Sequence, residues 1–154
     1  MNIFLRTIIL FISQGAYSGL SPFAPGTAGT VVGVILYWCM KDFSPGWYAL
    51  LMLAVFLLGT WAADRAEALL GRKDSPSIVI DEIAGYLVAM FLVPAGLWYA
   101  AAGFFLFRFF DIMKPFPLRR LEKIPGGLGV MLDDIGAGIY TNLVLQAAVL
   151  LLSR

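Results

Sequence analysis

The amino-acid sequence predicts an all-α, polytopic membrane protein whose residues 1–154 form a single integral membrane domain. Hydrophobic residues make up 60% of the chain and charged residues only 14%, whereas soluble domains carry roughly 25% charged residues. The mean hydropathy is +0.85. Four windows contain no charged residue, and several reach the roughly 20 residues that cross a hydrocarbon core of ~30 Å. These windows are residues 7–40, 43–63, 83–107 and 135–153.

The first half of the chain is expected to form a short N-terminal segment and two helices. Residues 3–12 are apolar but too short to span a bilayer, so they are expected to be interfacial or re-entrant. After a loop of turn-forming residues, an apolar helix runs to about Met40. The turn sequence KDFSPG leads to a second helix over 47–63, and residues 64–76 are predicted to form a charged loop.

Residues 77–113 are predicted to form a helical hairpin centred on Pro94, because the sequence VPAG combines Pro and Gly and should interrupt a helix. Asp81 lies 13 residues before Pro94, and Arg108 lies 14 residues after it. At helical rise both residues are about 20 Å from the turn. The hairpin should therefore bring Asp81 and Arg108 to the same depth.

A last helix is expected over about 135–152, which gives about five helices that span or nearly span the bilayer. Most Lys and Arg residues fall in two segments, 64–77 and 108–134, and the positive-inside rule places both in the cytoplasm. Arg119 and Arg120 are expected to contact lipid headgroups. The net charge of +1 does not indicate a nucleic-acid partner, and the oligomeric state stays open.

Five of the ten acidic residues form three clusters within apolar sequence, each at the predicted cytoplasmic end of a helix. A buried carboxylate is costly unless it is paired or binds a cation. Carboxylate ligands without His or thiolate suit Mg²⁺ or Mn²⁺ rather than zinc. The clusters are Asp81 with Glu82, Asp111, and Asp133 with Asp134.

Several phosphatase chemistries are excluded by composition. The chain has no histidine, which rules out a phosphohistidine intermediate and His-ligated zinc. The single cysteine, Cys39, lacks an Arg six positions later, so it does not match the cysteine phosphatases. A lone cysteine also rules out an internal disulfide.

Arg108, Asp111 and Lys114 recur every three residues at one helix end, and two cations beside a metal would suit an anionic ligand such as phosphate. A purely structural interpretation is also open. In that case Asp111 pairs with a neighbouring cation, Lys114 extends to the interface, and Asp133 or Asp134 caps the last helix.

The sequence SPFAPGTAGT places Gly26, Thr27 and Thr30 at the start of a helix. Glycine lets backbone N–H groups approach an anion, and a helix N-terminus favours negative charge. These three residues are therefore candidate phosphate-binding residues. Alternatively, Gly29 and Gly33 form a GxxxG pair that serves helix packing.

Four ordered stretches between residues 19 and 138 resemble the phosphatidylglycerophosphatase A family. They are GLSPFAPGTAGT, SIVIDEIAG, FRFFDIMKPFPLRRLE and GGLGVMLDDIGAG. The resemblance implies a Mg²⁺-dependent enzyme of the bacterial cytoplasmic (inner) membrane with its active site on the cytoplasmic side. Its substrate would be the membrane lipid phosphatidylglycerophosphate, which it would hydrolyse to phosphatidylglycerol and phosphate in phospholipid biosynthesis.

The residues and the resemblance predict the same site. One carboxylate would deprotonate an attacking water molecule while Arg108 stabilises the developing charge, although an aspartyl-phosphate route is equally open. The expected metal ligands for Mg²⁺ are Asp81, Glu82, Asp111 and Asp134. These four and Asp133 are the expected catalytic acids, and Arg108, Lys114, Gly26, Thr27 and Thr30 are expected to bind phosphate.

The alternative function is a divalent-cation transporter or channel, because intramembrane acids also line ion pathways. A transporter should carry polar groups across the whole bilayer. The outer part of the hairpin, LVAMFLVPAGLWYAAAG, is apolar instead. The sequence therefore favours the enzyme.

Overall fold

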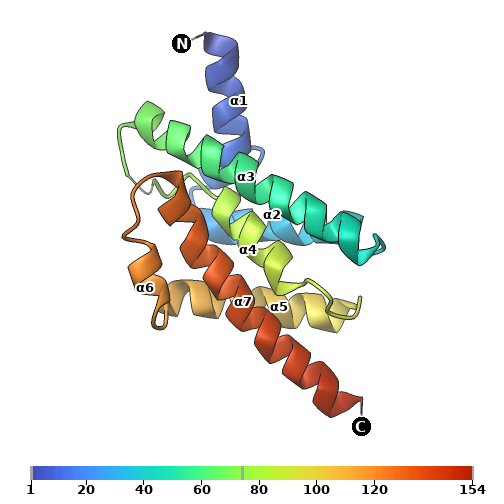
Figure 1. Cartoon of the computed structure of the whole chain (residues 1–154). Helices are drawn as coiled ribbons and strands as arrows, with labels where there is room; N and C mark the ends of the chain where they lie inside the picture. The colour runs from blue at the N-terminus through green and yellow to red at the C-terminus, as the bar shows by residue number, and fades with distance from the viewer. Residues whose placement is uncertain (1, 74, 154) are drawn as a thin grey trace.

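The structure is a computed structural model, and it describes residues 2–73 and 75–153. Every regular element in these two ranges is helical, so the predicted all-α class is confirmed. In chain order the elements are α1 (Ile3–Ser13), the 3₁₀-helix η1 (Ser18–Leu20), α2 (Pro25–Met40), α3 (Pro45–Leu70), α4 (Ile80–Ala89), α5 (Leu97–Met113), α6 (Leu118–Leu121) and α7 (Gly127–Leu152), as Figure 1 shows.

Within the described ranges, α3 and α7 are the helices long and apolar enough to cross a membrane. Each has 26 residues, or about 39 Å at helical rise. The apolar helix α2 has only 16 residues, and α5 has 17. The structure thus supports a membrane protein with two helices of full spanning length, whereas the expected set of about five is not confirmed.

The predicted hairpin around Pro94 is confirmed, with α4 and α5 as its arms. The Tyr86 hydroxyl on α4 donates a hydrogen bond of 2.9 Å to the Ala100 carbonyl on α5. At the turn, Asn142 of α7 donates to the carbonyl of Phe91 at 2.7 Å. Carbonyl groups at a helix end have no partner within the helix, and water cannot solvate them inside a bilayer. The Asn142 side chain therefore stabilises the point at which α4 ends.

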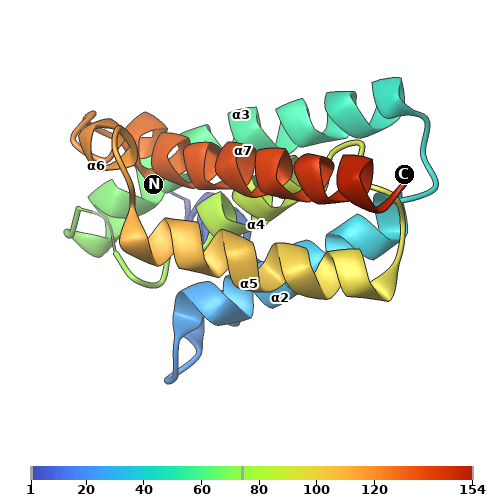
Figure 2. The same cartoon turned by 90° about the horizontal axis from the view of Figure 1, so that it is seen from below.

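The short helix α4 lies in the middle of the bundle, between α7 and α2 (Figures 1 and 2). Eight of its ten residues are buried. Gly29 and Gly33 of α2 pack against its start, because a Cβ on Gly29 would lie 2.6 Å from Val79 and one on Gly33 would lie 3.2 Å from Tyr86. The interpretation of these two glycines as a packing pair is confirmed.

Helix α3 continues to Leu70, so the prediction that the charged loop begins at residue 64 is wrong. The sequence of residues 64–70, DRAEALL, consists mostly of strong helix formers, which extend the helix beyond its apolar part. Gly71 then ends α3 with a φ of 65°, a left-handed conformation that glycine adopts without strain.

Helix α7 begins at Gly127 rather than near residue 135. A Cβ on Gly127 would overlap the Thr60 carbonyl of α3, so the missing side chain lets α7 start in contact with α3. The Gly127 N–H donates to the Asp64 carboxylate at 3.4 Å. Asp133 and Asp134 consequently lie in the second turn of α7, and the interpretation of either residue as its N-cap is wrong.

We expect residues 72 and 120 to face one side of the membrane and residue 95 the other, because the hairpin returns the chain to its starting side. Arg72→Cys, Ala95→Cys and Arg120→Cys, each made in a Cys39→Ser background, place single thiols at exposed positions. Labelling of intact cells with a membrane-impermeant maleimide should modify only the cysteine at 95. Modification of 72 and 120 from opposite sides would contradict the hairpin topology.

Candidate active site

Asp81 and Glu82 lie in the first turn of α4, where the helix dipole favours negative charge. The backbone before this turn is held by α1, since the Val79 N–H donates to the Ser13 carbonyl at 2.9 Å. The Gln14 side chain also donates to the Ser77 hydroxyl, at 3.4 Å. The end of α1 thus fixes the point at which the two acids enter the bundle.

Three carboxylates converge at this point. Asp81, Glu82 and Asp134 of α7 each offer an oxygen, and the three oxygens lie within 4.8 Å of one another. Asp81 and Asp134 are only 8% and 3% exposed. Each of the three side chains also has a buried oxygen without a hydrogen-bond partner: Asp81 Oδ1, Glu82 Oε2 and Asp134 Oδ2.

This donor set fits a hard divalent cation. Buried carboxylates with unpaired oxygens are costly unless a cation compensates them, and carboxylate oxygens are the ligands that Mg²⁺ prefers. The structure therefore brings together Asp81, Glu82 and Asp134 as a group that could bind a metal ion. We name these three residues the acid cluster.

Asp111, the fourth expected ligand, lies beside the acid cluster but is bonded to Arg108. Its Oδ2 atom accepts a hydrogen bond of 2.6 Å from Arg108 Nη1. The predicted pairing of Asp111 with a neighbouring cation is thus confirmed, while its role as a metal ligand stays a prediction.

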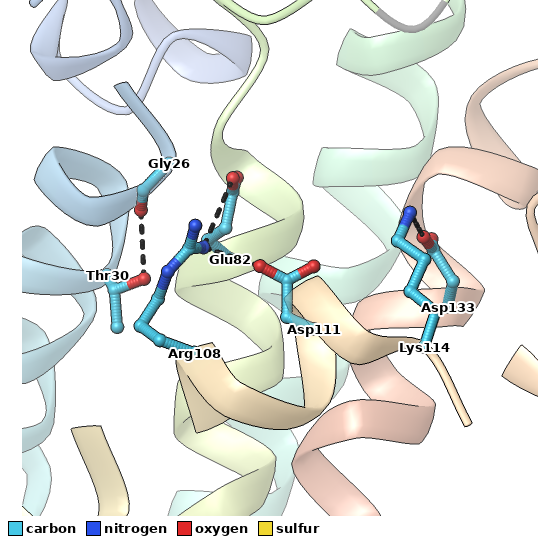
Figure 3. A network of polar contacts seen from close by, with 7 residues as sticks. All are labelled: Gly26, Thr30, Glu82, Arg108, Asp111, Lys114 and Asp133. Atoms are coloured by element: carbon cyan, nitrogen blue, oxygen red, sulfur yellow. Dashed lines mark hydrogen bonds and ion pairs between the residues drawn. The ribbon is translucent and has the colours of Figure 1, made fainter. Parts of the chain in front are cut away.

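Arg108 connects α5 to the acid cluster. Its Nη1 atom lies 3.7 Å from Glu82 Oε1 in addition to its bond with Asp111. Its Nε atom is buried without a hydrogen-bond partner. Figure 3 shows the guanidinium between Glu82 and the start of α2. The Nη1 atom of Arg108 is therefore held by two carboxylates, while its Nε–H donor has no partner.

Gly26 brings the first turn of α2 against this arginine. A Cβ on Gly26 would overlap Glu82 Oε1 and would lie 3.0 and 3.1 Å from the Nη1 and Nη2 atoms of Arg108. The N-cap of α2 is Ala24, which offers no side-chain acceptor to the first N–H groups. A helix N-terminus of this kind favours an anion.

The two threonines near the start of α2, Thr27 and Thr30, are placed differently. Thr30 is fully buried, and its hydroxyl donates to the Gly26 carbonyl at 2.9 Å, as Figure 3 shows. That bond stabilises the first turn of α2. Thr27 is partly buried on this turn. Phosphate binding by Gly26, Thr27 or Thr30 stays a prediction.

Lys114 and Asp133 form a separate ion pair. Lys114 Nζ lies 2.6 Å from Asp133 Oδ2 and 3.4 Å from Glu122 Oε2. Burial lowers the pKa of Lys114, but the hydrogen bond and the charge of Asp133 outweigh it, so the pKa lies above its ordinary value. Lys114 therefore stays protonated, and one oxygen of Asp133 is committed to it.

Sequence reasoning missed Glu122 and the packing glycines Gly85 and Gly138. Glu122 reaches Lys114 because the chain turns back through α6, and no sequence period signals that turn. A Cβ on Gly138 would overlap the Gly85 carbonyl. The only available signal was the sequence GAG after Asp134, which is typical of close helix contacts in membranes.

The family model of phosphatidylglycerophosphatase A matches residues 11–149. The chain belongs to the phosphatidylglycerophosphatase A family. A phosphatidylglycerophosphatase A of Haemophilus influenzae is 39% identical over 152 residues, covering 95% of this chain and 91% of the relative. The phosphatidylglycerophosphatase A of Escherichia coli is 36% identical over 134 residues, covering 84% of this chain and 77% of the relative. The resemblance described from the sequence motifs is confirmed.

This chain is also similar to a protein of Bacteroides thetaiotaomicron that is provisionally named phosphatidylinositol-3-phosphatase. It is 37% identical over 147 residues, covering 90% of this chain and 92% of the relative. No solved structure matches this chain.

We expect Gly26→Ala to lower turnover about 10²-fold, the effect typical of misplacing a reacting group by about 1 Å. The added Cβ would displace Glu82 and crowd Arg108, but these are the mobile ends of side chains, so the protein should still fold. Gly46→Ala is the matched control, since a Cβ there meets nothing within 4 Å. Wild-type turnover by Gly26→Ala would show that α2 does not belong to the site.

Proposed function

We propose that this chain is a lipid phosphatase that hydrolyses phosphatidylglycerophosphate to phosphatidylglycerol and phosphate in phospholipid biosynthesis. Family membership and the two relatives named phosphatidylglycerophosphatase A support the proposal. The observation that carries it is the acid cluster, whose buried oxygens lack partners, beside the guanidinium of Arg108. Anionic ligands for a metal and a cation for phosphate are the groups that this hydrolysis needs.

Asp81, Glu82 and Asp134 would hold the metal ion, which we propose to be Mg²⁺, with Asp111 as a further candidate ligand. When bound, the ion would supply positive charge that stabilises the negative charge developing on the phosphate oxygens. Its carboxylate ligands come from α4 and α7, so the packing of these two helices sets the distance between them.

Arg108 would bind the phosphate that is removed. A guanidinium offers several directed donors and can hold two phosphate oxygens at once. Asp111 and Glu82 orient this guanidinium from one side, and its unpartnered Nε donor remains available. The first turn of α2, at Gly26, would supply backbone N–H groups from the opposite side.

A carboxylate of the site would accept the proton of the attacking water molecule. Asp81, Glu82 and Asp134 each have an unpartnered oxygen for this role. Asp133 also has one, Oδ1, while its Oδ2 atom is bonded to Lys114. An aspartyl-phosphate route would use the same groups, with one carboxylate as nucleophile. Both routes place the reacting phosphate between the acid cluster and Arg108.

We further propose a location in the bacterial cytoplasmic membrane, as a multi-pass protein with its site on the cytoplasmic side. The positive-inside rule supports this orientation, because the exposed residues Arg72, Arg119 and Arg120 belong to the two cation-rich segments that flank the hairpin. Beyond the acid cluster, the apolar side chains of Leu87 on α4 and of its C-cap residue Met90 are buried. Nothing among the described residues supports the alternative of a divalent-cation transporter.

We expect Asp81→Asn and Asp134→Asn each to abolish phosphate release from phosphatidylglycerophosphate, because each removes a charged metal ligand. Asp111→Asn should do the same if Asp111 binds the metal or holds Arg108. The assay uses protein purified in detergent, with and without Mg²⁺. Asp42→Asn, an exposed acid outside the site, is the control. Near-normal turnover by any two of the three variants, or full activity without a divalent cation, would contradict the proposed site.

Arg108→Lys should lower turnover by about 10²–10³-fold, the usual effect of losing one directed contact to a developing charge. The amount of protein in the membrane should change little, because lysine keeps the positive charge next to Asp111. Arg72→Lys serves as the control at an exposed position. If Arg108 only neutralises Asp111, the lysine variant will turn over saturating substrate within about threefold of wild type.

A further inference from the structure

A cationic pocket lies outside the acid cluster, where α5 ends and α6 begins. It encloses about 380 Å³. Three of its lining residues are cations and none is acidic. The lining residues are Met113, Lys114, Pro115, Phe116, Pro117, Arg119 and Arg120.

The two arginines of this pocket carry uncompensated charge. The ion pairs found among the described residues of this region involve Arg108 or Lys114, and none uses Arg119 or Arg120. The Arg120 guanidinium lies over the Phe116 ring, 4.7 Å from its centroid. Arg119 Nη2 donates to the Met113 carbonyl at 3.4 Å. These neutral contacts hold the guanidinium groups in place and leave both positive charges available to an anion.

Lys114 joins this pocket to the acid cluster. It lines the pocket, and its Nζ atom is bonded to Asp133, the chain neighbour of Asp134 in the acid cluster. Figure 3 shows the Lys114–Asp133 pair beside Asp111, with Arg108 and Glu82 on the other side. The Lys114–Asp133 ion pair therefore connects the lining of the pocket to the part of α7 that carries Asp134.

The surroundings of the pocket are suited to the depth of lipid headgroups. Phe116 and Met113 are large apolar side chains that are 71% and 54% exposed, and they line the pocket together with the exposed arginines. Apolar side chains beside long cationic ones are typical of the boundary between acyl chains and headgroups. We therefore expect an anion in this pocket to be the phosphate of a lipid headgroup.

We propose that this pocket binds the phosphodiester of the lipid substrate, while the acid cluster and Arg108 take its terminal phosphomonoester. The proposal rests on the proposed function, because phosphatidylglycerophosphate carries both groups, joined by a glycerol. A phosphodiester has one negative charge and needs no metal, which matches a pocket of guanidinium and ammonium groups. Lys114, Arg119 and Arg120 would then distinguish this substrate from lipids that carry a phosphomonoester alone.

The test compares the double variant Arg119→Gln/Arg120→Gln of the full chain with wild type, in mixed micelles of fixed composition. The substrates are phosphatidylglycerophosphate and phosphatidic acid with the same acyl chains, and phosphatidic acid has no phosphodiester. We expect KM for phosphatidylglycerophosphate to rise about tenfold, as for the loss of a charged hydrogen bond, with kcat changed less than about twofold. KM for phosphatidic acid should stay within about twofold. Where its cleavage is too slow to follow, its inhibition constant against phosphatidylglycerophosphate replaces KM.

Lys123→Gln is the matched control, since Lys123 is an exposed cation of the same segment that does not line the pocket. An equal rise in KM for both lipids would overturn the proposal and indicate general attraction to an anionic surface. An unchanged KM for phosphatidylglycerophosphate would overturn it as well. If the double variant does not fold, each single variant is tested in the same way.

Failure of the proposed function would be seen separately, as wild-type protein that releases no phosphate from phosphatidylglycerophosphate. The pocket would still be tested by direct binding of phosphatidylglycerol, which keeps the phosphodiester but has no phosphomonoester. Wild type should bind it more tightly than the double variant. Equal binding by the two proteins would overturn the assignment of the pocket.

Discussion

The contact between the backbones of α4 and α7 is the constraint on which the rest of the structure depends. At Gly138 a Cβ would overlap the Gly85 carbonyl, and at Gly85 it would lie 2.6 Å from the Asp134 carbonyl oxygen. Neither helix could approach so closely with larger residues at these positions. Small residues allow this approach in membranes, where helix association depends on packing rather than on the hydrophobic effect. The same contact places Asp134 beside the first turn of α4, where Asp81 lies.

Burying α4 carries an electrostatic cost that the surrounding elements offset in different ways. At its N-terminal end, the helix dipole favours the negative charge of Asp81 and Glu82, and the Arg108 guanidinium lies 3.7 Å from Glu82 Oε1. At its C-terminal end, Asn142 donates to the carbonyl groups of Ala89 and Phe91. The unpartnered oxygens of the acid cluster remain without a compensating group from the described residues. A bound cation would compensate these oxygens, so the ion proposed for hydrolysis would also stabilise the fold around the site.

The charges are also ordered in space. Asp81, Asp133 and Asp134 of α4 and α7 are the most buried charged residues, Arg108 and Lys114 at the end of α5 form ion pairs with acids around them, and Arg119 on α6 is exposed. The more buried cations thus have acidic partners, whereas the exposed cation has none among the described residues. Buried charges need partners, whereas exposed ones are solvated and remain free to meet a ligand. This order suits a lipid that approaches from the headgroup layer and presents its phosphate to the buried acid cluster.

The sequence by itself determined the all-α class, the hairpin at Pro94 and the approach of Arg108 to the first turn of α4, because residue spacing and helix breakers set distances along a helix axis. It also contained the motifs of the family. Only the tertiary structure decided which acids converge. Asp134 joins the acid cluster, whereas its neighbour Asp133 is bonded to Lys114, since successive residues of a helix point in different directions. Those directions depend on the rotation of each helix about its axis, and that rotation is set by contacts between helices, which no spacing along one chain segment specifies.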